Sequence, residues 1–128
     1  IDVTVEYAKE RQQFGQPIGG FQAVKHHLAS VLLAVEFAAP AVHRAAWSLA
    51  TDQPTVPRDV SMAKAMAGDA AEQAARVALQ VHGAIGYTVE YDLHLWLKRI
   101  WALAAAWGDA GWHRERVAES LLGPRPTH

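Results

Sequence analysis

Apolar residues recur at spacings of three and four over three long stretches of the chain, with polar residues between them. This pattern is typical of helices that bury one face. The apolar positions are Phe21, Val24, Leu28, Leu32 and Val35; Ala63, Met66, Ala70, Ala74, Val77 and Val81; and Leu93, Trp96, Leu97, Ile100, Leu103 and Trp107. No segment alternates with a period of two for long enough to indicate a strand, so the pattern predicts an all-α fold.

Proline and glycine indicate where the first helices end. Residues 3–13 have the composition of the end of a helix that stops at Gly15-Gln16-Pro17. Pro40 removes one backbone hydrogen bond from the next helix, and residues 41–50 then resume the periodic pattern, so we expect a kink there rather than a stop. Residues 51–59 contain two prolines and are predicted to form a loop.

Similar signals mark the later helices. Asp59 or Ser61 could cap the start of the third helix, which is expected to end at Gly83. Gly108-Asp109 predicts a break or a kink after the fourth helix, and residues 110–122 predict a final short helix.

Alanine dominates the apolar stripe of the third helix, and such small residues let neighbouring helices approach closely. The sequence therefore predicts an antiparallel four-helix bundle with a short extra C-terminal helix. Residues 1–122 are expected to form this single bundle domain, and residues 123–128 a flexible tail.

Composition removes several classes of function. With 12 basic and 13 acidic residues among 128, the formal charge of −1 gives no field suited to nucleic acid or anionic lipid. The absence of cysteine excludes disulfides and thiol chemistry. We find neither a signal-peptide pattern nor an apolar run of about 18 residues, so we predict a cytoplasmic protein without membrane insertion.

Few side-chain patterns suggest catalysis. No serine lies in a glycine-flanked elbow, and no glutamate and histidine have the spacing of three that a di-iron helical bundle uses on two helices. We therefore predict no metal site. The isolated histidines His43, His82 and His113 are interpreted as surface or hydrogen-bonded interior imidazoles.

Two glycine-bearing turns, at residues 15–20 and 83–86, lie beside helix ends but match no dinucleotide or phosphate-loop motif. Arg11 lies about one helical turn before Gly15 and could direct a permanently charged planar group toward a phosphate. The alternative is a solvated arginine at a helix end.

Two stretches, YAKERQQFGQPIGGFQAVKHHLA and AKAMAGDAAEQAARVALQVHGAIGYTVEYDLHLWLKR, resemble the signature segments of the acyl-CoA dehydrogenase family. The first resembles its R-x-x-F-G motif with a later glutamine. The second resembles Q-x-x-G-G-x-G-[YF]-x-x-E, with Ala84 in place of the second glycine. The resemblance implies the C-terminal helical bundle of an FAD-dependent enzyme that dehydrogenates acyl-CoA thioesters in lipid catabolism, and a chain that begins partway down the first helix of that bundle.

The resemblance also implies roles for individual residues. Arg11 would contact the pyrophosphate of an FAD held by the neighbouring subunit, and Phe14 and Gln22 its adenosine part. Gln80 and Gly83 would approach the same cofactor. In this family the bundle mediates dimer and tetramer packing, which implies other acyl-CoA dehydrogenase subunits as partners and acyl-CoA as substrate.

The chain departs from the family where the catalytic base is often found. Many members carry a glutamate before a glycine after the fourth helix, but the matching stretch AAWGDAG places Trp107 there, and an indole cannot accept a proton. Asp109 is about 200° further round if the helix continues. Asp109 and Gly111 also replace residues that contribute to flavin contact in the family. Other members carry the base before the position of Ile1, so no catalytic residue is assigned within the chain, which is expected to be inactive alone.

Three interpretations remain open: a domain of an active dehydrogenase with its base elsewhere, a non-catalytic subunit of a heteromeric dehydrogenase, or a helical assembly module without flavin. Trp96, Trp101, Trp107 and Trp112 indicate either a large buried interface or ordinary core packing.

Overall fold

The computed structural model describes residues 1–88 and 91–124 of the chain, and the described part is almost entirely helical. Its α-helices are α1 (Asp2–Glu10), α2 (Gln22–Ala50), α3 (Val56–His82), α4 (Leu93–Ala105) and α5 (Ala110–Leu122). Two short strands, β1 (Gln12–Gln13) and β2 (Gln16–Pro17), and the 3-10 helices η1 (Ile18–Gly20) and η2 (Gly83–Tyr87) complete the described elements. The predicted all-α class is confirmed.

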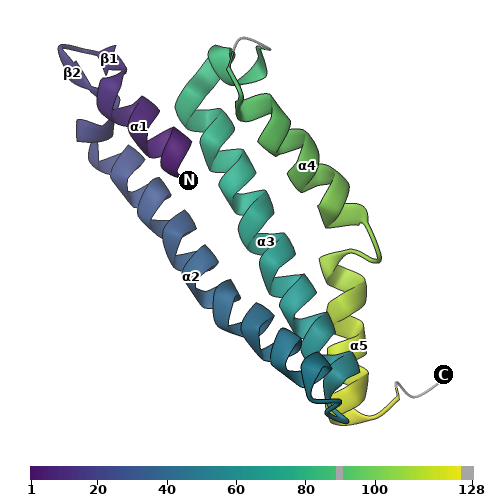
Figure 1. The fold of residues 1–128 in the computed structure, drawn as a ribbon. Coiled ribbons are helices and arrows are strands. Elements are labelled where there is room, and N and C mark those ends of the chain that lie inside the picture. Colours follow the sequence, from purple (N-terminus) through teal and green to yellow (C-terminus); the bar gives the residue numbers. More distant parts are fainter. Residues whose placement is uncertain (89–90, 125–128) are drawn as a thin grey trace.

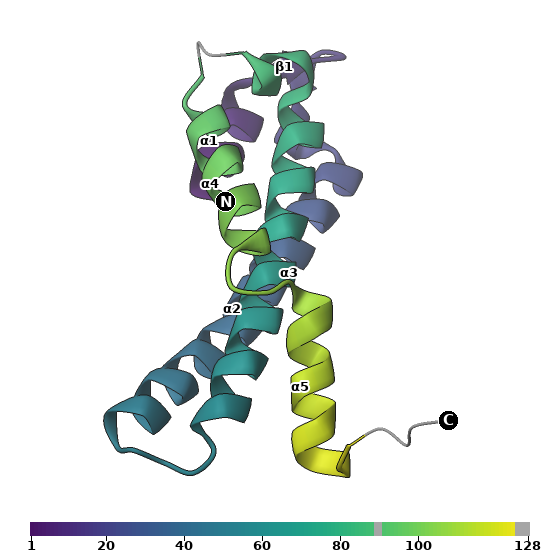
Figure 2. The same ribbon diagram turned by 90° about the vertical axis from the view of Figure 1, so that its right-hand side faces the viewer.

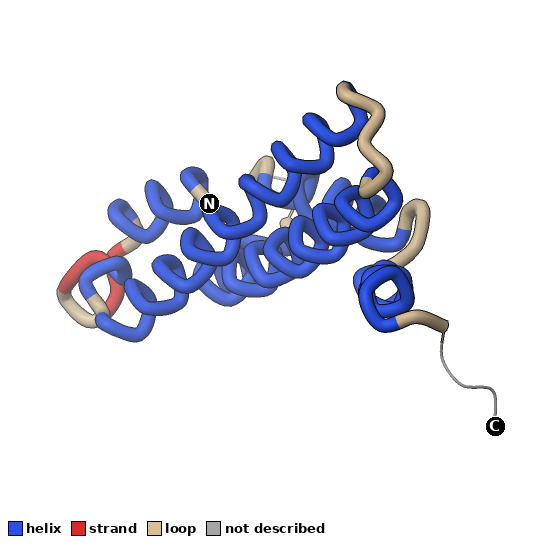
Figure 3. The backbone as a smooth tube through the Cα atoms, turned by 90° about the horizontal axis from the view of Figure 1, so that it is seen from below, coloured by secondary structure: helices blue, strands red, loops and turns tan. Residues whose placement is uncertain are grey.

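Helices α2 and α3 form a long antiparallel pair joined by the loop at the bottom of Figure 1. Helices α1 and α4 lie beside the upper half of this pair, and α5 continues beside the lower half of α3 (Figures 1 and 2). The predicted bundle is therefore present, with α4 and α5 sharing its fourth position. The strands are confined to one small hairpin at the edge of the molecule (Figure 3).

The core consists mainly of alanine. Its buried apolar residues are Ala8, Val31, Ala38, Ala41, Ala45, Ala63, Ala65, Ala70, Ala75, Ala78, Leu93 and Leu97. Small side chains allow the helix backbones to approach closely, as the alanine stripe predicted. Many large apolar side chains point outward instead, including Phe37 and Leu49 of α2 and Trp96 of α4. The four tryptophans of the last third are all exposed, so core packing within this chain does not explain them.

Several predicted helix boundaries are confirmed. Helix α2 runs through Pro40 without stopping, and α3 ends before Gly83, whose φ of 61° suits glycine. The chain breaks at Gly108 between α4 and α5, where φ is 97°. These outcomes follow from the local conformational preferences of proline and glycine.

The predicted start of α3 was wrong. The helix begins at Val56, and neither Asp59 nor Ser61 caps it. Pro57 explains the earlier start, because proline lacks an N–H and its fixed φ suits the first helical turn. The two expected caps instead lie inside the helix and are buried.

The N-terminal segment also differs from prediction. Helix α1 ends at Glu10, and residues 12–17 form an antiparallel hairpin in which Gln12 pairs with Pro17 and Gln13 with Gln16. Two-residue strands are too short to produce a detectable period of two, so the hydrophobic pattern could not predict them.

Helix α2 is long and apolar enough to cross a bilayer, judged by length and composition alone. The prediction that no such run exists was therefore wrong. Lys25, Glu36 and Arg44 are spread so widely along the helix that a stretch of it still averages apolar. One such helix is weak evidence of membrane insertion, because helices that pack against protein pass the same test.

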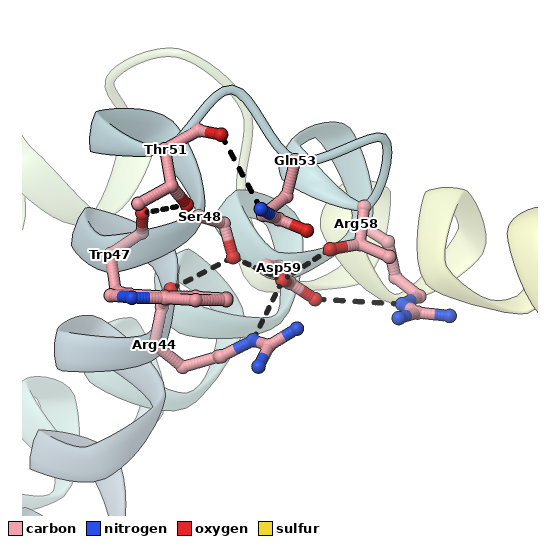
Figure 4. A network of polar contacts seen from close by, with 8 residues as sticks. Arg44, Trp47, Ser48, Thr51, Gln53, Arg58 and Asp59 are labelled. Carbon is pink, nitrogen blue, oxygen red and sulfur yellow. Dashed lines mark hydrogen bonds and ion pairs between the residues drawn. The ribbon is translucent and has the colours of Figure 1, made fainter.

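A buried carboxylate ties α2 to α3 beside the loop that joins them (Figure 4). The Oδ2 atom of Asp59 accepts hydrogen bonds from Ser48 Oγ at 2.5 Å, Thr55 Oγ1 at 2.8 Å and Arg44 Nε at 3.0 Å. Arg58 Nε lies 3.6 Å from Oδ1. The hydrogen bond from Ser48, followed by those from Thr55 and Arg44, holds the pKa of Asp59 well below its usual range although burial opposes this.

We expect Asp59→Asn to lower the thermal unfolding midpoint at pH 7, because an amide cannot accept from the three donors as a carboxylate does. Since the folded-state pKa is lowered, the ionised Asp59 stabilises the fold above an unfolded-state pKa of about 3.9, and this stabilisation is lost as pH falls below that value. The unfolding midpoint of the variant should therefore depend less on pH between about 5 and 2.

The matched control is Asp52→Asn in the neighbouring loop between α2 and α3. Asp52 is exposed and has a φ of 49°, which asparagine tolerates equally well. Equal acid sensitivity in wild type and Asp59→Asn would contradict the assignment of the buried carboxylate as a stabilising group.

Candidate functional site

The end of α1 continues directly into the hairpin. The backbone N–H of Arg11 donates to Tyr7 O at 2.9 Å, which completes the last turn of the helix. Ile18 N donates to Arg11 O at 2.8 Å and so extends the strand pairing by one step. Only Phe14 and Gly15 remain at the tip of the hairpin.

The tip has an unusual backbone. Phe14 and Gly15 have φ values of 52° and 80°, as expected for the two central residues of a tight hairpin turn in which both φ angles are positive. Glycine adopts this conformation without cost, whereas a bulky residue such as phenylalanine rarely does. The Phe14 side chain is 90% exposed and contacts the ring of Phe21 edge-on, at a centroid distance of 6.1 Å. Burial within this chain therefore does not compensate the strain at Phe14.

Close backbone packing fixes the hairpin to α1. A Cβ atom on Gly19 would lie 2.9 Å from the backbone oxygen of Ala8, so only glycine fits where η1 crosses α1. In contrast, a Cβ on Gly15 would meet no atom within 4 Å. The hairpin is thus held at its base and open at its tip.

Arg11 is exposed and, among residues 1–88 and 91–124, makes no side-chain hydrogen bond or ion pair. Gln22, the first residue of α2, is exposed as well. Both side chains project from the segment that holds the strained tip. This end of the molecule therefore offers the guanidinium of Arg11, an exposed ring and an amide.

The end of α3 lies at the same end of the molecule, since Figures 1 and 2 both show the hairpin and η2 there. The rings of Tyr7 and His82 stack with centroids 4.2 Å apart and planes 18° apart. Gln80 is exposed two residues before the end of the helix, and a Cβ on Gly83 would meet no atom within 4 Å. The structure therefore brings together the two segments that carry Arg11, Phe14, Gln22, Gln80 and Gly83.

The elbow between α4 and α5 has a different character and lies about 20 Å away along α4. Trp107 has a φ of 59° and is 81% exposed. His113 Nε2 donates to Trp107 O at 3.1 Å, and Lys64 Nζ donates to Leu103 O at 2.9 Å at the end of α4. These two contacts hold the backbone of the elbow at the end of α4 and at Trp107 itself.

The carboxylate of Asp109 at the elbow is engaged in a hydrogen bond. Its Oδ1 accepts a hydrogen bond from Trp112 N at 2.8 Å, which caps the start of α5. The break at Gly108 removes the helical geometry on which the expected 200° rotation rested. A pocket of about 350 Å³ beside the elbow is lined by Lys64, Ala67, Gly68, Ala71, Ile100, Leu103, Ala104 and Trp107.

Sequence reasoning missed three contributors to these sites. The hairpin tip, the stacking partner Tyr7 of His82 and the elbow contact of Lys64 all depend on tertiary contacts. The Phe-Gly pair followed by Pro17 was a local signal for a tight turn, although phenylalanine at its first position is atypical. No comparable local signal exists for Tyr7 or Lys64.

Residues 1–122 match the family model described as acyl-CoA dehydrogenase, C-terminal domain. The chain belongs to the acyl-CoA dehydrogenase family. It is 42% identical over 130 residues to the acyl-CoA dehydrogenase FadE34 of Mycobacterium tuberculosis. This alignment covers 98% of this chain and 18% of FadE34. The family resemblance of the two signature stretches is thus confirmed.

Solved structures agree with this assignment. The ChsE4–ChsE5 complex from Mycobacterium tuberculosis superposes with a TM-score of 0.89 at 30% identity, over 98% of this chain and 34% of that one. The FAD complex of PigA gives a TM-score of 0.85 at 30% identity, and the superposition covers 95% of this chain and 32% of that one. The chain therefore spans about a third of the length of these two solved proteins, and it corresponds to the helical C-terminal domain of the family.

We expect Phe14→Asn to stabilise the flavin-free protein by about 1 kcal/mol, because asparagine before glycine suits a turn with two positive φ angles. Urea unfolding would measure this change. Gly15→Ala, the matched control at the next position, should destabilise the protein because alanine is strained at a φ of 80°. A loss of stability in Phe14→Asn would show that the phenylalanine ring contributes more to the fold than its exposure indicates.

Proposed function

We propose that this chain is the C-terminal bundle of an FAD-dependent acyl-CoA dehydrogenase and that its hairpin end completes the FAD site of a neighbouring subunit. The observation that carries the proposal is the combination of an unpaired Arg11 with a strained, exposed Phe14 on a hairpin fixed at its base. Strained residues of this kind cluster where a protein meets a ligand.

The residues present fit a dinucleotide. The guanidinium of Arg11 can donate two parallel hydrogen bonds to pyrophosphate oxygens. The exposed ring of Phe14 and the amide of Gln22 suit the flat adenine and the ribose of the adenosine part. Gln80 offers a further amide, and the open space around Gly83 lets backbone approach the same ligand. When bound, FAD accepts the hydride of the dehydrogenation.

The neighbouring subunit is part of the proposal because the chain leaves much apolar surface uncovered. Phe37 and Leu49 of α2 and Leu95 and Trp96 of α4 are all more than half exposed, and large exposed apolar surfaces mark protein interfaces. We propose that other acyl-CoA dehydrogenase subunits cover it, as homo- or hetero-oligomers. Acyl-CoA as substrate, cytoplasmic localisation and the absence of membrane insertion remain predictions for the complete protein.

Arg11→Ala should weaken FAD binding to the complete protein by about 10- to 100-fold, as expected for losing a charge-assisted bidentate contact. The thermal midpoint of the flavin-free protein should not change, since Arg11 has no side-chain partner among the described residues. Fluorescence titration of the apoprotein with FAD would measure the affinity.

Arg11→Lys should give intermediate affinity, because lysine keeps the charge and loses the planar geometry. Arg99→Ala, on the exposed face of α4, is the control for general loss of charge. Unchanged FAD affinity in Arg11→Ala would contradict the role of Arg11. A complete wild-type protein without flavin absorbance would instead favour an assembly module.

A second candidate is a non-catalytic subunit in a heteromeric dehydrogenase. It is favoured by Trp107 at the position of the family's glutamate and by the use of Asp109 as a helix cap. In this case the complete protein would bind FAD in a complex, and the partner subunit would supply the base.

We expect Asp109→Asn to leave both stability and acyl-CoA-dependent flavin reduction unchanged, because asparagine caps helices as well as aspartate does. Stopped-flow absorbance of the complete protein would measure flavin reduction. If turnover in Asp109→Asn falls by a hundredfold or more, Asp109 is the base and the cap assignment is incomplete. Reduction only after a second subunit is added would support the non-catalytic candidate.

A further inference from the structure

His82 is the last residue of α3 and, with His113, one of two buried histidines in the described structure. It is only 4% exposed, and it stacks on Tyr7 while lying 5.1 Å, centroid to centroid, from the tilted ring of Tyr91. Its ring therefore lies between α1 and the segment that leads into α4. Its stacking on Tyr7 is one of the contacts between α1 and α3.

The hydrogen bonds of the ring define its protonation state. Nδ1 lies 2.9 Å from Ala78 O, and since a carbonyl oxygen only accepts, Nδ1 carries the proton and donates. Nε2 is buried and has no hydrogen-bond partner in the described structure. The neutral ring leaves only a lone pair unsatisfied, whereas the protonated ring would bury a charged donor.

Among the described residues, no ion pair or hydrogen bond brings a charged side chain to the ring. The rings that face it are those of Tyr7 from α1 and Tyr91 from the segment before α4. The nearby carboxylate of Glu6 is exposed and pairs with Lys9 at 2.7 Å. Burial accordingly lowers the pKa of His82, against the smaller opposing effect of the Ala78 carbonyl.

Few side chains of α1 are buried in the described structure, and they are those of Thr4 and Ala8. Segments with few buried contacts open before the rest of a protein does. Loss of the stacked imidazole would therefore release α1 before it affected the long α2–α3 pair.

We propose that His82 is a proton-sensitive clamp, in which the neutral imidazole holds α1 and its hairpin on the end of α3 and protonation releases them. The clamp fixes the position of Arg11 relative to Gly83. If the proposed FAD site is correct, on which this last step rests, His82 is a positioning residue for that site and cofactor retention depends on pH.

The buried, unpartnered Nε2 determines in which direction docking of α1 changes with pH. The folded state with α1 docked disfavours the proton, so docking is complete above the ordinary histidine pKa of about 6.5 and weakens as pH falls below it. The opening equilibrium of α1 should rise by up to about tenfold for each pH unit below about 6.5.

Hydrogen exchange measured by mass spectrometry on the complete protein tests the clamp without reference to flavin. Between pH 7.5 and 5.5, and after correction for the intrinsic pH dependence of exchange, opening of residues 2–10 in wild type should increase at least severalfold. Residues 60–75 of α3 serve as the internal reference and should not change.

His82→Phe keeps a stacking ring without a titrating nitrogen, so its α1 should stay docked at both pH values. His82→Gln offers a second non-titrating variant should the phenyl ring not fit. His82→Ala should release α1 at both pH values. The proposal is overturned if wild-type opening of α1 is independent of pH, or if the folded non-titrating variants keep the wild-type pH dependence.

Flavin retention measured on the same samples separates the clamp from the proposed function. Loss of FAD below pH 6.5 in wild type, but not in His82→Phe, supports both. Release of α1 without any loss of FAD supports the clamp and contradicts the placement of the flavin at the hairpin end.

Discussion

The contact between Tyr7 and His82 is the interaction on which the candidate site depends. It joins two segments that are far apart in the sequence, the end of α1 and the end of α3, through rings stacked 4.2 Å apart. The tight approach of Gly19 to Ala8 then transmits the position of α1 to the hairpin. Without both contacts Arg11 and Gly83 would belong to separate surfaces, and neither surface alone offers enough contacts for a large ligand. The site is therefore a product of helix docking rather than of either motif alone.

The packing of the bundle explains why so much apolar surface remains outside. Alanine-rich contacts bring α2 and α3 close together but bury little area per residue, so the core holds few large side chains. Many of the larger apolar residues of α2 and α4 lie on the helix faces that point away from this core. A chain with this distribution of apolar residues resembles one layer of a larger assembly. This agrees with the solved relatives, of whose length it spans about a third. The same distribution explains why α2 meets the length and composition of a membrane-spanning helix.

The sequence was most informative where local physics decides the structure. The periodic stripes predicted the long helices, and Gly83 and Gly108 predicted their ends, because backbone preferences act within a few residues. It was least informative where a tertiary contact decides. Asp59 appeared to be a cap but is a buried acceptor for side chains of α2, and Pro57, in the predicted loop, lies in the first turn of the helix. His82 was expected to be either a surface or a hydrogen-bonded interior imidazole, and its burial and its hydrogen bond to Ala78 fit the second of these. Its unpartnered Nε2 and its stacking on Tyr7 could be found only in the structure.

Family membership and local chemistry constrain function at different places in this chain. The hairpin end carries the arginine, phenylalanine and glycine of the stretch that resembles the family's motif, whereas the elbow presents the indole of Trp107 where the resemblance leads us to expect a carboxylate. The structure of the complete protein with bound FAD is the most direct test of the flavin site at the hairpin end. The account predicts that the pyrophosphate of an FAD carried by another subunit lies within hydrogen-bond distance, about 2.7–3.2 Å, of the Arg11 guanidinium. A hairpin packed against protein, with FAD bound elsewhere, would contradict it.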